Sequence, residues 1–279
     1  MLLTKEQLKR YDDEGFLFLP ECLSPREVDA MKTELPAIFS ENSPRRIVEK
    51  DGMVRSVYGS HMNNDVFQRL TRHPRLVEPA TQILKSAIYV YQFKINAKKA
   101  FGGDNWEWHQ DYIFWRKEDG MPSPRVMSIA IYLDDVTEFN GPLFLIPGSH
   151  KEGVIDVSAR DQNPEHDIRR HETYHDSPSW IANLTTRLRY SLDKQIVGEM
   201  IEKYGIVSPK GPRGSALLMN ANTIHGSPSN ISPFDRAVVI VTFNSIENVP
   251  ANVSNPRPEF ISSRSPAPVA PLAIDTLLV

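Results

Sequence analysis

The spacing of apolar residues predicts helices in the first third of the chain. One helical pattern ends at Gly15, a residue suited to the left-handed backbone that often follows a helix. Another begins at Ser24, where Glu27 three positions later completes a capping-box sequence and a proline occupies the first helical position. The expected helices cover residues 4–14, 24–39 and 68–84, the last interrupted near its prolines.

Strand-like runs dominate from residue 88 onward. These runs are rich in β-branched and aromatic residues, and the run that starts at Arg236 is apolar enough to be buried on both faces. The expected strands lie at residues 16–19, 88–97, 106–114, 126–133, 215–219 and 237–245. The pattern therefore predicts a mainly β protein with flanking helices.

Composition narrows the class of protein. A chain of 279 residues with 40% hydrophobic and 24% charged residues can bury a substantial core, and β domains of this length are often undivided. The net charge of −3 and the lack of a basic stripe argue against nucleic acid as a partner. No apolar run approaches the ~20 residues of a membrane span. We expect a monomer or homodimer acting on a small molecule.

Three regions depart from the expected β core. We expect one domain over 1–279, with a mainly helical flank at 1–86, a lid or insertion at 151–208 and an extended tail at 263–279. His171 and His175 could share a second metal on a helix, but a solvated loop is favoured. The single cysteine, Cys22, excludes an intramolecular disulfide and fits the cytoplasm.

Three residues have the chemistry of an open metal site. His109 and Asp111 are two positions apart, so on a strand their side chains would point to the same face. His225 follows at 225 − 109 = 116 residues. A His-x-Asp pair alone is common at protein surfaces. Two imidazoles and one carboxylate with open positions, however, are typical of non-haem Fe(II) oxygenases.

Arg236 strengthens this prediction. Ferrous iron bound by this triad retains about one positive charge and can take an anionic chelating cosubstrate. A guanidinium in a buried strand needs a partner, and a carboxylate is the best geometric match. A dicarboxylate that chelates iron at its 2-oxo acid end and meets Arg236 at the other end is 2-oxoglutarate. An internal salt bridge is the alternative interpretation of Arg236.

Several motifs together resemble the phytanoyl-CoA dioxygenase superfamily, and ectoine hydroxylases most of all. The similarity is dense over residues 91–150 and 211–260. The motifs are His109-Gln110-Asp111, Glu118-Asp119-Gly120-Met121-Pro122 after Trp115, Asn140-Gly141-Pro142-Leu143, Ile146-Pro147-Gly148-Ser149-His150, Asn222-Thr223-Ile224-His225-Gly226-Ser227, Asn230-Ile231-Ser232-Pro233 and Arg236.

The resemblance implies a double-stranded β-helix, the jelly-roll core of cupin-like proteins. It also implies ferrous iron, 2-oxoglutarate and O2 as cofactor and cosubstrates, with hydroxylation of an unactivated C–H bond. The 2-oxoglutarate residues would be Arg236, Ser128, Trp108, Asn96 and Ser227, and the substrate residues Gln92, Lys94, Trp115, Val238 and Ile240. From the residues alone, Gln92 and Lys94 could equally face water, Trp115 could be core, and Ser128 could bond the backbone.

Three departures from ectoine hydroxylases bear on the substrate. Those enzymes are expected to carry arginine at the position of Lys94, and asparagine and phenylalanine at those of Val238 and Ile240. Because discrimination rests on a few placed groups, we expect a substrate other than ectoine: a small polar molecule such as an amino acid or a related zwitterion.

Other activities fit parts of the pattern. The same oxidant could perform desaturation or cyclisation. A zinc hydrolase also uses two histidines and a carboxylate, although it would not need Arg236, and a non-catalytic β-barrel would not need the triad. Since Asp111 occupies a ligand position, hydroxylation is favoured over halogenation.

Overall fold

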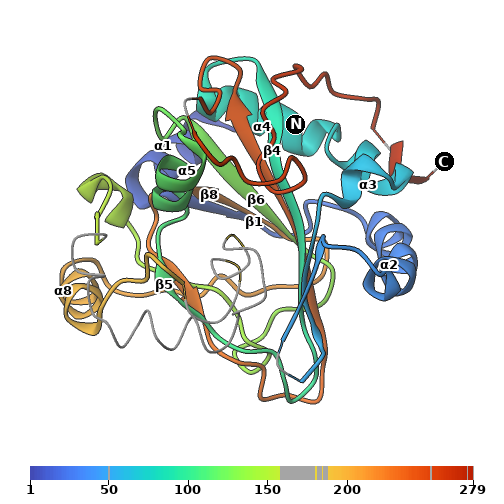
Figure 1. Cartoon of the computed structure of the whole chain (residues 1–279), viewed down its shortest axis with the longest axis horizontal. Helices are drawn as coiled ribbons and strands as arrows, with labels where there is room; N and C mark the ends of the chain where they lie inside the picture. The colour runs from blue at the N-terminus through green and yellow to red at the C-terminus, as the bar shows by residue number, and fades with distance from the viewer. Residues whose placement is uncertain are drawn as a thin grey trace.

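Two antiparallel sheets form the core of the protein (Figure 1). The computed structural model describes residues 1–49, 51–157, 180, 184, 188–251, 253–274 and 276–278. The larger sheet has the order β1 (Phe16–Leu19), β8 (Ala216–Asn220), β6 (Val126–Tyr132), β10 (Arg236–Ser245), β4 (Ile88–Lys98), β3 (Val54–Tyr58) and β2 (Arg46–Val48). The smaller sheet has the order β5 (Trp106–His109), β9 (His225–Ser227) and β7 (Phe144–Leu145). This arrangement is the expected jelly-roll core.

The helices begin and end where local sequence signals place them. Thr4 and Ser24 each make a complete capping box, and Gly15 closes the first helix with φ of 80°. The helices are α1 (Lys5–Glu14), α2 (Pro25–Ser40), α3 (Asp65–Leu70), α4 (Pro74–Leu84), α5 (Asp111–Asp119) and α8 (Lys194–Tyr204), with short 3-10 turns η1 (Ser60–Met62), η2 (Ser149–Glu152) and η3 (Thr276–Leu278). None of the helices in the described ranges has the length and apolarity of a membrane span.

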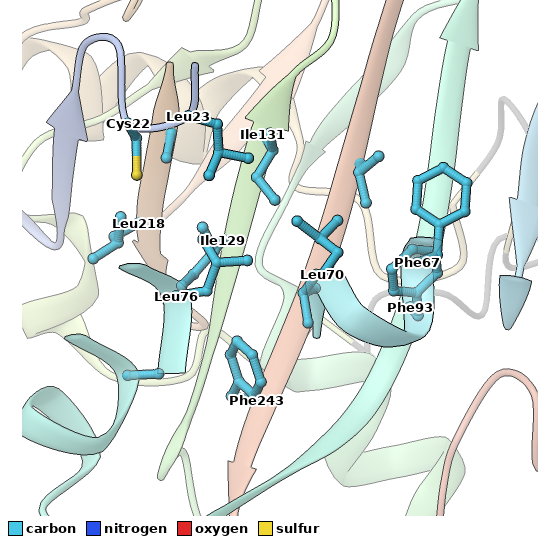
Figure 2. Packing of buried hydrophobic residues seen from close by; sticks show 14 of the residues in the cluster. Cys22, Leu23, Phe67, Leu70, Leu76, Phe93, Ile129, Ile131, Leu218 and Phe243 are labelled. Atoms are coloured by element: carbon cyan, nitrogen blue, oxygen red, sulfur yellow. The ribbon is translucent and has the colours of Figure 1, made fainter. Parts of the chain in front are cut away.

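The main hydrophobic core lies between the larger sheet and helices α2, α3 and α4 (Figure 2). Phe67 and Leu70 of α3 and Leu76 of α4 meet strand residues such as Ile129 and Phe243, all fully buried. Because side chains alternate across a strand, this packing uses one face of each strand. The other face of the larger sheet is turned toward the smaller sheet, and polar side chains lie between the two sheets.

One predicted strand is wrong. Strand β5 ends at His109, Gln110 lies at the N-cap, and Asp111 is the first residue of helix α5 rather than part of the strand. Aromatic and polar residues alternate over 106–109 only, and this alternation breaks at Gln110 and Asp111, where the strand ends and the helix begins. The metal-binding geometry therefore depends on a strand-to-helix turn.

The other predicted strands and helices are present, with ends shifted by a few residues. Strands β2, β3, β7 and β9 were not predicted, because they are short and lack clear alternation. Helix α8, which Asp193 caps, was also not predicted within the region expected to be a lid. His171 and His175 lie outside the described residues.

Candidate iron and cosubstrate site

The two histidines of the triad face each other across the smaller sheet. His109 on β5 is the register partner of His225 on β9, which explains how residues far apart in sequence meet. Their ring centroids are 4.2 Å apart. Asp111 Oδ1 lies 3.6 Å from His109 Nε2 and 3.9 Å from His225 Nε2. One candidate ligand atom from each of these residues falls within 4.8 Å of the others.

The hydrogen bonds of the imidazoles leave the correct nitrogens available to a metal. His109 Nδ1 lies 2.6 Å from the Glu107 carbonyl, and His225 Nδ1 lies 2.9 Å from the Thr223 carbonyl. A carbonyl only accepts, so each Nδ1 carries the proton and each Nε2 offers a lone pair toward Asp111. Burial and the neighbouring His109 lower the pKa of His225 to about 4, which keeps this ring neutral.

Asp111 is ionised despite its burial. Burial opposes ionisation, but the Lys94 ammonium and the contact with His109 together hold the pKa of this carboxyl well below its usual range. A negative carboxylate and two neutral imidazoles are the donor set that ferrous iron takes in this class of site. The residues therefore fit the metal.

Two buried cations lie side by side near the triad. Arg236 and Lys98 are register partners on β10 and β4, and each is about 4% exposed or less. Arg236 donates to the carbonyls of Asn140 (3.3 Å) and Gly141 and to Ser227 Oγ (3.4 Å). Among the described residues, neither cation forms an ion pair with a carboxylate. A buried guanidinium without a counter-ion, beside an amine that can take up a proton, makes a site for an anion.

Lys98 is the more strongly perturbed cation. Its Nζ donates to the carbonyls of Asp104 (3.0 Å) and Pro228, neither of which supplies a full negative charge. Burial, followed by the charges of Arg236 and Arg55, lowers the pKa of Lys98 to about 6. An incoming carboxylate would relieve this electrostatic cost.

The other residues predicted near 2-oxoglutarate lie in varied surroundings. Asn96 accepts from Ser56 Oγ (2.8 Å), and Ser227 donates to the Gly141 carbonyl (2.9 Å) beside Arg236. Ser128 bonds Thr242 across β6 and β10. Trp108 packs against Gly226, where any added Cβ would be 3.2 Å from the indole. Among the residues predicted to bind 2-oxoglutarate, Asn96 on the strand of Lys98 and Ser227 beside Arg236 therefore lie next to the two cations.

A small cavity opens beside the triad. It contains about 360 Å³ of empty space, part of it continuous with solvent. Its lining residues are Tyr58, Gln92, Lys94, Trp106, His109, Asp111, Phe114, Trp115, Leu184, Leu188 and Arg257. The lining combines iron ligands, cations and aromatic rings, a mixture that suits a small polar molecule.

Three of the five predicted substrate residues line this cavity. Gln92 donates to the Ile261 carbonyl (2.8 Å), and Trp115 packs edge-on against Tyr91. Lys94 lies close enough to Asp111 to influence its ionisation. Val238 and Ile240 share a hydrophobic cluster with residues of β6 and β8 and are not among the lining residues.

Arg257 supplies a second cation to the cavity. Its side chain is 5% exposed, and Nε donates to Asp119 Oδ1 at 2.8 Å while Nη2 pairs with the other carboxylate oxygen. Tyr91 also donates to Asp119, so the carboxylate is held at the C-terminal end of α5. The Asp119 contacts use Nε and Nη2 of the guanidinium and fix its orientation.

Sequence reasoning missed Lys98 and Arg257. The alternation of Gln92, Lys94 and Asn96 along β4 extends to Lys98, so one more step of that pattern would have included it. Arg257 follows the last strand in a proline-containing segment, and no periodicity places it near residues of β4. Only the fold brings it to the cavity.

The comparisons with known proteins agree with this geometry. The family model of phytanoyl-CoA dioxygenase (PhyH) matches residues 11–238. The chain belongs to the phytanoyl-CoA dioxygenase family. It is therefore a 2-oxoglutarate-dependent non-haem iron dioxygenase, with Fe(II), 2-oxoglutarate and O2 as its cofactor and cosubstrates.

Two curated relatives are similar over nearly the whole chain. The L-proline trans-4-hydroxylase of Streptomyces griseoviridis is 38% identical over 269 residues, covering 96% of each chain. The ectoine dioxygenase of Bordetella bronchiseptica is 36% identical and covers 94% of this chain and 83% of its own. By name, one is a hydroxylase of L-proline and the other a dioxygenase of ectoine.

Solved structures show the same fold. EctD from S. alaskensis, solved with 2-oxoglutarate and 5-hydroxyectoine, has a TM-score of 0.79 and 28% identity, covering 97% of this chain and 87% of that one. The carbocyclase SnoK from nogalamycin biosynthesis has a TM-score of 0.67 at 18% identity, covering 98% of this chain and 95% of that one. At that identity SnoK supports the fold alone.

Proposed function

We propose that this dioxygenase hydroxylates a free amino acid, with L-proline as the first candidate. The observation that supports this most is the small cavity that presents Lys94 and Arg257 beside His109 and Asp111. The similarity to an L-proline hydroxylase over almost the entire chain supports the same substrate class.

The triad holds the iron in this proposal. His109 and His225 bind through Nε2, because each Nδ1 proton is held by a backbone carbonyl. Asp111 adds the negative ligand. Ferrous iron with 2-oxoglutarate and O2 supplies the oxidising power for hydroxylation of a C–H bond, with release of succinate and CO2. The chain itself contributes position and exclusion of solvent.

Arg236 and Lys98 hold the far carboxylate of 2-oxoglutarate. Both are buried next to each other and lack a carboxylate partner among the described residues. Arg236 keeps its guanidinium oriented through the Asn140 and Gly141 carbonyls. The Ser227 hydroxyl lies beside it and can add a hydrogen bond.

In this proposal the substrate carboxylate lies between the Lys94 ammonium and Nη1 of Arg257, the one guanidinium nitrogen of Arg257 that does not bond Asp119. These cations line the cavity from β4 and from the segment after β10, on the same cavity as the iron ligands. Trp106, Phe114 and Trp115 provide apolar walls suited to the carbon skeleton of a small amino acid. Lysine rather than arginine at position 94 argues for a substrate other than ectoine.

A cytoplasmic location completes the proposal. The lone cysteine, Cys22, is buried, and burial raises the pKa of its thiol to about 11, which makes it an unreactive core residue. A chain with one inert thiol has no need of an oxidising compartment. Free amino acids and 2-oxoglutarate are both available in the cytoplasm.

The test is a substrate panel with the full-length protein, Fe(II), 2-oxoglutarate and O2. L-proline, other free amino acids and ectoine are compared by substrate-dependent succinate release and by the mass of the product. We expect the largest stimulation, and a gain of one oxygen atom, with L-proline or a close analogue. Stimulation by ectoine but by no amino acid would refute the proposal.

A further inference from the structure

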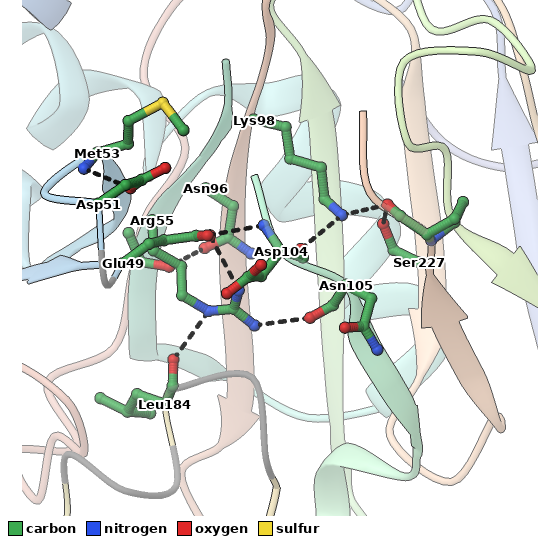
Figure 3. Close-up of polar contacts among 12 residues, drawn as sticks. Glu49, Asp51, Met53, Arg55, Asn96, Lys98, Asp104, Asn105, Leu184 and Ser227 are labelled. Carbon is green, nitrogen blue, oxygen red and sulfur yellow. Dashed lines mark hydrogen bonds and ion pairs between the residues drawn. The ribbon is translucent and has the colours of Figure 1, made fainter. Parts of the chain in front are cut away.

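The Arg55 guanidinium is buried between three chain segments (Figure 3). Its Nη1 pairs with Glu49 Oε1 at 3.1 Å, its Nε donates to the Leu184 carbonyl at 3.2 Å, and its Nη2 donates to the Asn105 carbonyl at 3.1 Å. Its Cζ also lies over the Trp106 ring, 3.7 Å from the ring centre. All three nitrogens and one face of the group are therefore engaged.

Two of these partners form the wall of the substrate cavity. Trp106 and Leu184 both line it, whereas Arg55 is not among the lining residues. Trp106 comes from β5, and Leu184 comes from a part of the chain that is remote in sequence. Arg55 is thus a common neighbour that connects two separate pieces of the wall.

Glu49 keeps Arg55 from acting as a binding cation. The side chains of this pair are 2% and 5% exposed, so the positive charge is neutralised within hydrogen-bond distance. The second oxygen of Glu49 accepts from the Asp104 backbone at 2.7 Å, which ties the β2–β3 hairpin to the segment leading into β5. A neutralised, fully bonded guanidinium has little left to offer a substrate carboxylate.

We propose that Arg55 is a positioning residue that fixes Trp106 and Leu184 relative to each other and thereby sets the shape of the substrate cavity. This inference rests on the proposed function only in naming the cavity as the substrate site. Arginine is required because a planar fork serves three acceptors while its face stacks on an indole. A lysine could keep the Glu49 pair but not the fork or the stacking.

The kinetic test compares Arg55→Lys with native protein, using L-proline and 2-oxoglutarate. We expect the KM for L-proline to rise about tenfold through loss of charge-assisted hydrogen bonds, while the KM for 2-oxoglutarate changes less than about twofold. A misplaced wall should also lower the ratio of hydroxyproline to succinate, because cosubstrate is consumed without productive placement of substrate. Arg46→Lys, on the same hairpin and bonded to the Phe39 carbonyl, is the matched control.

Hydrogen exchange provides a measurement that does not need turnover. The Leu188 amide donates to Glu107 (3.0 Å), and the Leu192 amide donates to the Trp108 carbonyl (2.7 Å), so both report on the wall next to β5. We expect faster exchange at both amides in Arg55→Lys and native rates in Arg46→Lys. If L-proline is not a substrate, the proposed function fails. The exchange rates of the two variants still decide whether Arg55 positions the wall.

A second variant covers the case in which Arg55→Lys does not fold. Glu49→Gln keeps the shape of the partner but removes its charge. We therefore expect the KM for L-proline and the exchange rates of the two amides to rise as in Arg55→Lys, but by less. Native KM for L-proline together with native exchange, in whichever variant folds, would overturn the inference. An equal rise of the two KM values in Arg55→Lys would overturn it as well, because Arg55 would then act on the whole site. Glu49→Gln is judged by the KM for L-proline and by exchange, since Glu49 also raises the pKa of Lys98 in the cosubstrate site.

Discussion

Binding of 2-oxoglutarate should be accompanied by uptake of a proton at Lys98. In the protein without cosubstrate, burial and the charges of Arg236 and Arg55 lower the pKa of Lys98 to about 6. At pH 7.5 the amine is therefore mostly neutral. A carboxylate placed against Lys98 and Arg236 favours the ammonium, so its pKa rises on binding and a proton is taken from solvent.

The sign of the pH dependence follows from this linkage. Below pH 6 the amine is already charged, and affinity for 2-oxoglutarate should not depend on pH. Above pH 6 each unit of pH costs about 1.4 kcal/mol to protonate Lys98, so the cost at pH 7.5 is about 2 kcal/mol. Affinity should accordingly fall by up to about tenfold per pH unit until the pKa of the complex is reached.

Anaerobic titration calorimetry at pH 7.5, in two buffers with different ionisation enthalpies, measures the protons taken up. We expect native protein to take up close to one proton for each 2-oxoglutarate bound, and Lys98→Met to take up none. At pH 6 this variant should bind 2-oxoglutarate roughly 10- to 150-fold more weakly, the value of a charge-assisted hydrogen bond, and the loss should shrink as pH rises. Lys99→Met, an exposed lysine paired with Asp235, is the control. If the affinity of native protein for 2-oxoglutarate did not depend on pH, the reasoning would be refuted.

Three further predictions concern the triad and the two anion sites. Anaerobic Fe(II) and 2-oxoglutarate should give native protein a weak visible charge-transfer band that His109→Ala or Asp111→Ala abolishes; a band that survives in both variants would remove these residues as ligands. Arg236→Ala should weaken cosubstrate binding by roughly 3–5 kcal/mol, seen as a KM for 2-oxoglutarate that rises far more than that for the substrate. Lys94→Met should lower kcat/KM for the substrate by roughly 10- to 150-fold and leave the band intact, and an unaffected variant would contradict its contact with the substrate.

The chemistry of the site was predictable because its residue types are distinctive. His109, Asp111 and His225 form one cluster in the structure, as the motif predicted, and Arg236 lies in a fully buried strand without a carboxylate partner among the described residues. The expected local geometry was partly wrong. Asp111 comes to the site through the first turn of a helix, because the alternation of aromatic and polar residues that indicates a strand covers only residues 106–109.

The shape of the cavity could not be read from local patterns. Arg257 reaches it only because the segment after β10 packs on the end of α5. At that end Gly120 adopts φ of 70°, and an added Cβ would lie 2.2 Å from the Ala251 carbonyl oxygen. Such contacts depend on tertiary packing rather than on periodicity. Lys98, by contrast, continued an alternation already visible on β4.

Arg257 lies in the segment after β10, and this position has a consequence for engineering the cavity. His109, Asp111, His225 and Arg236 all fall within residues 11–238, the part matched by the family model, whereas Arg257 lies beyond it. The candidate iron and cosubstrate residues and one group proposed to contact the substrate are therefore encoded in separate stretches of this chain. Substitutions in the later stretch can therefore change one wall of the cavity without altering the candidate iron ligands, which makes that stretch a place to engineer selectivity alongside Lys94.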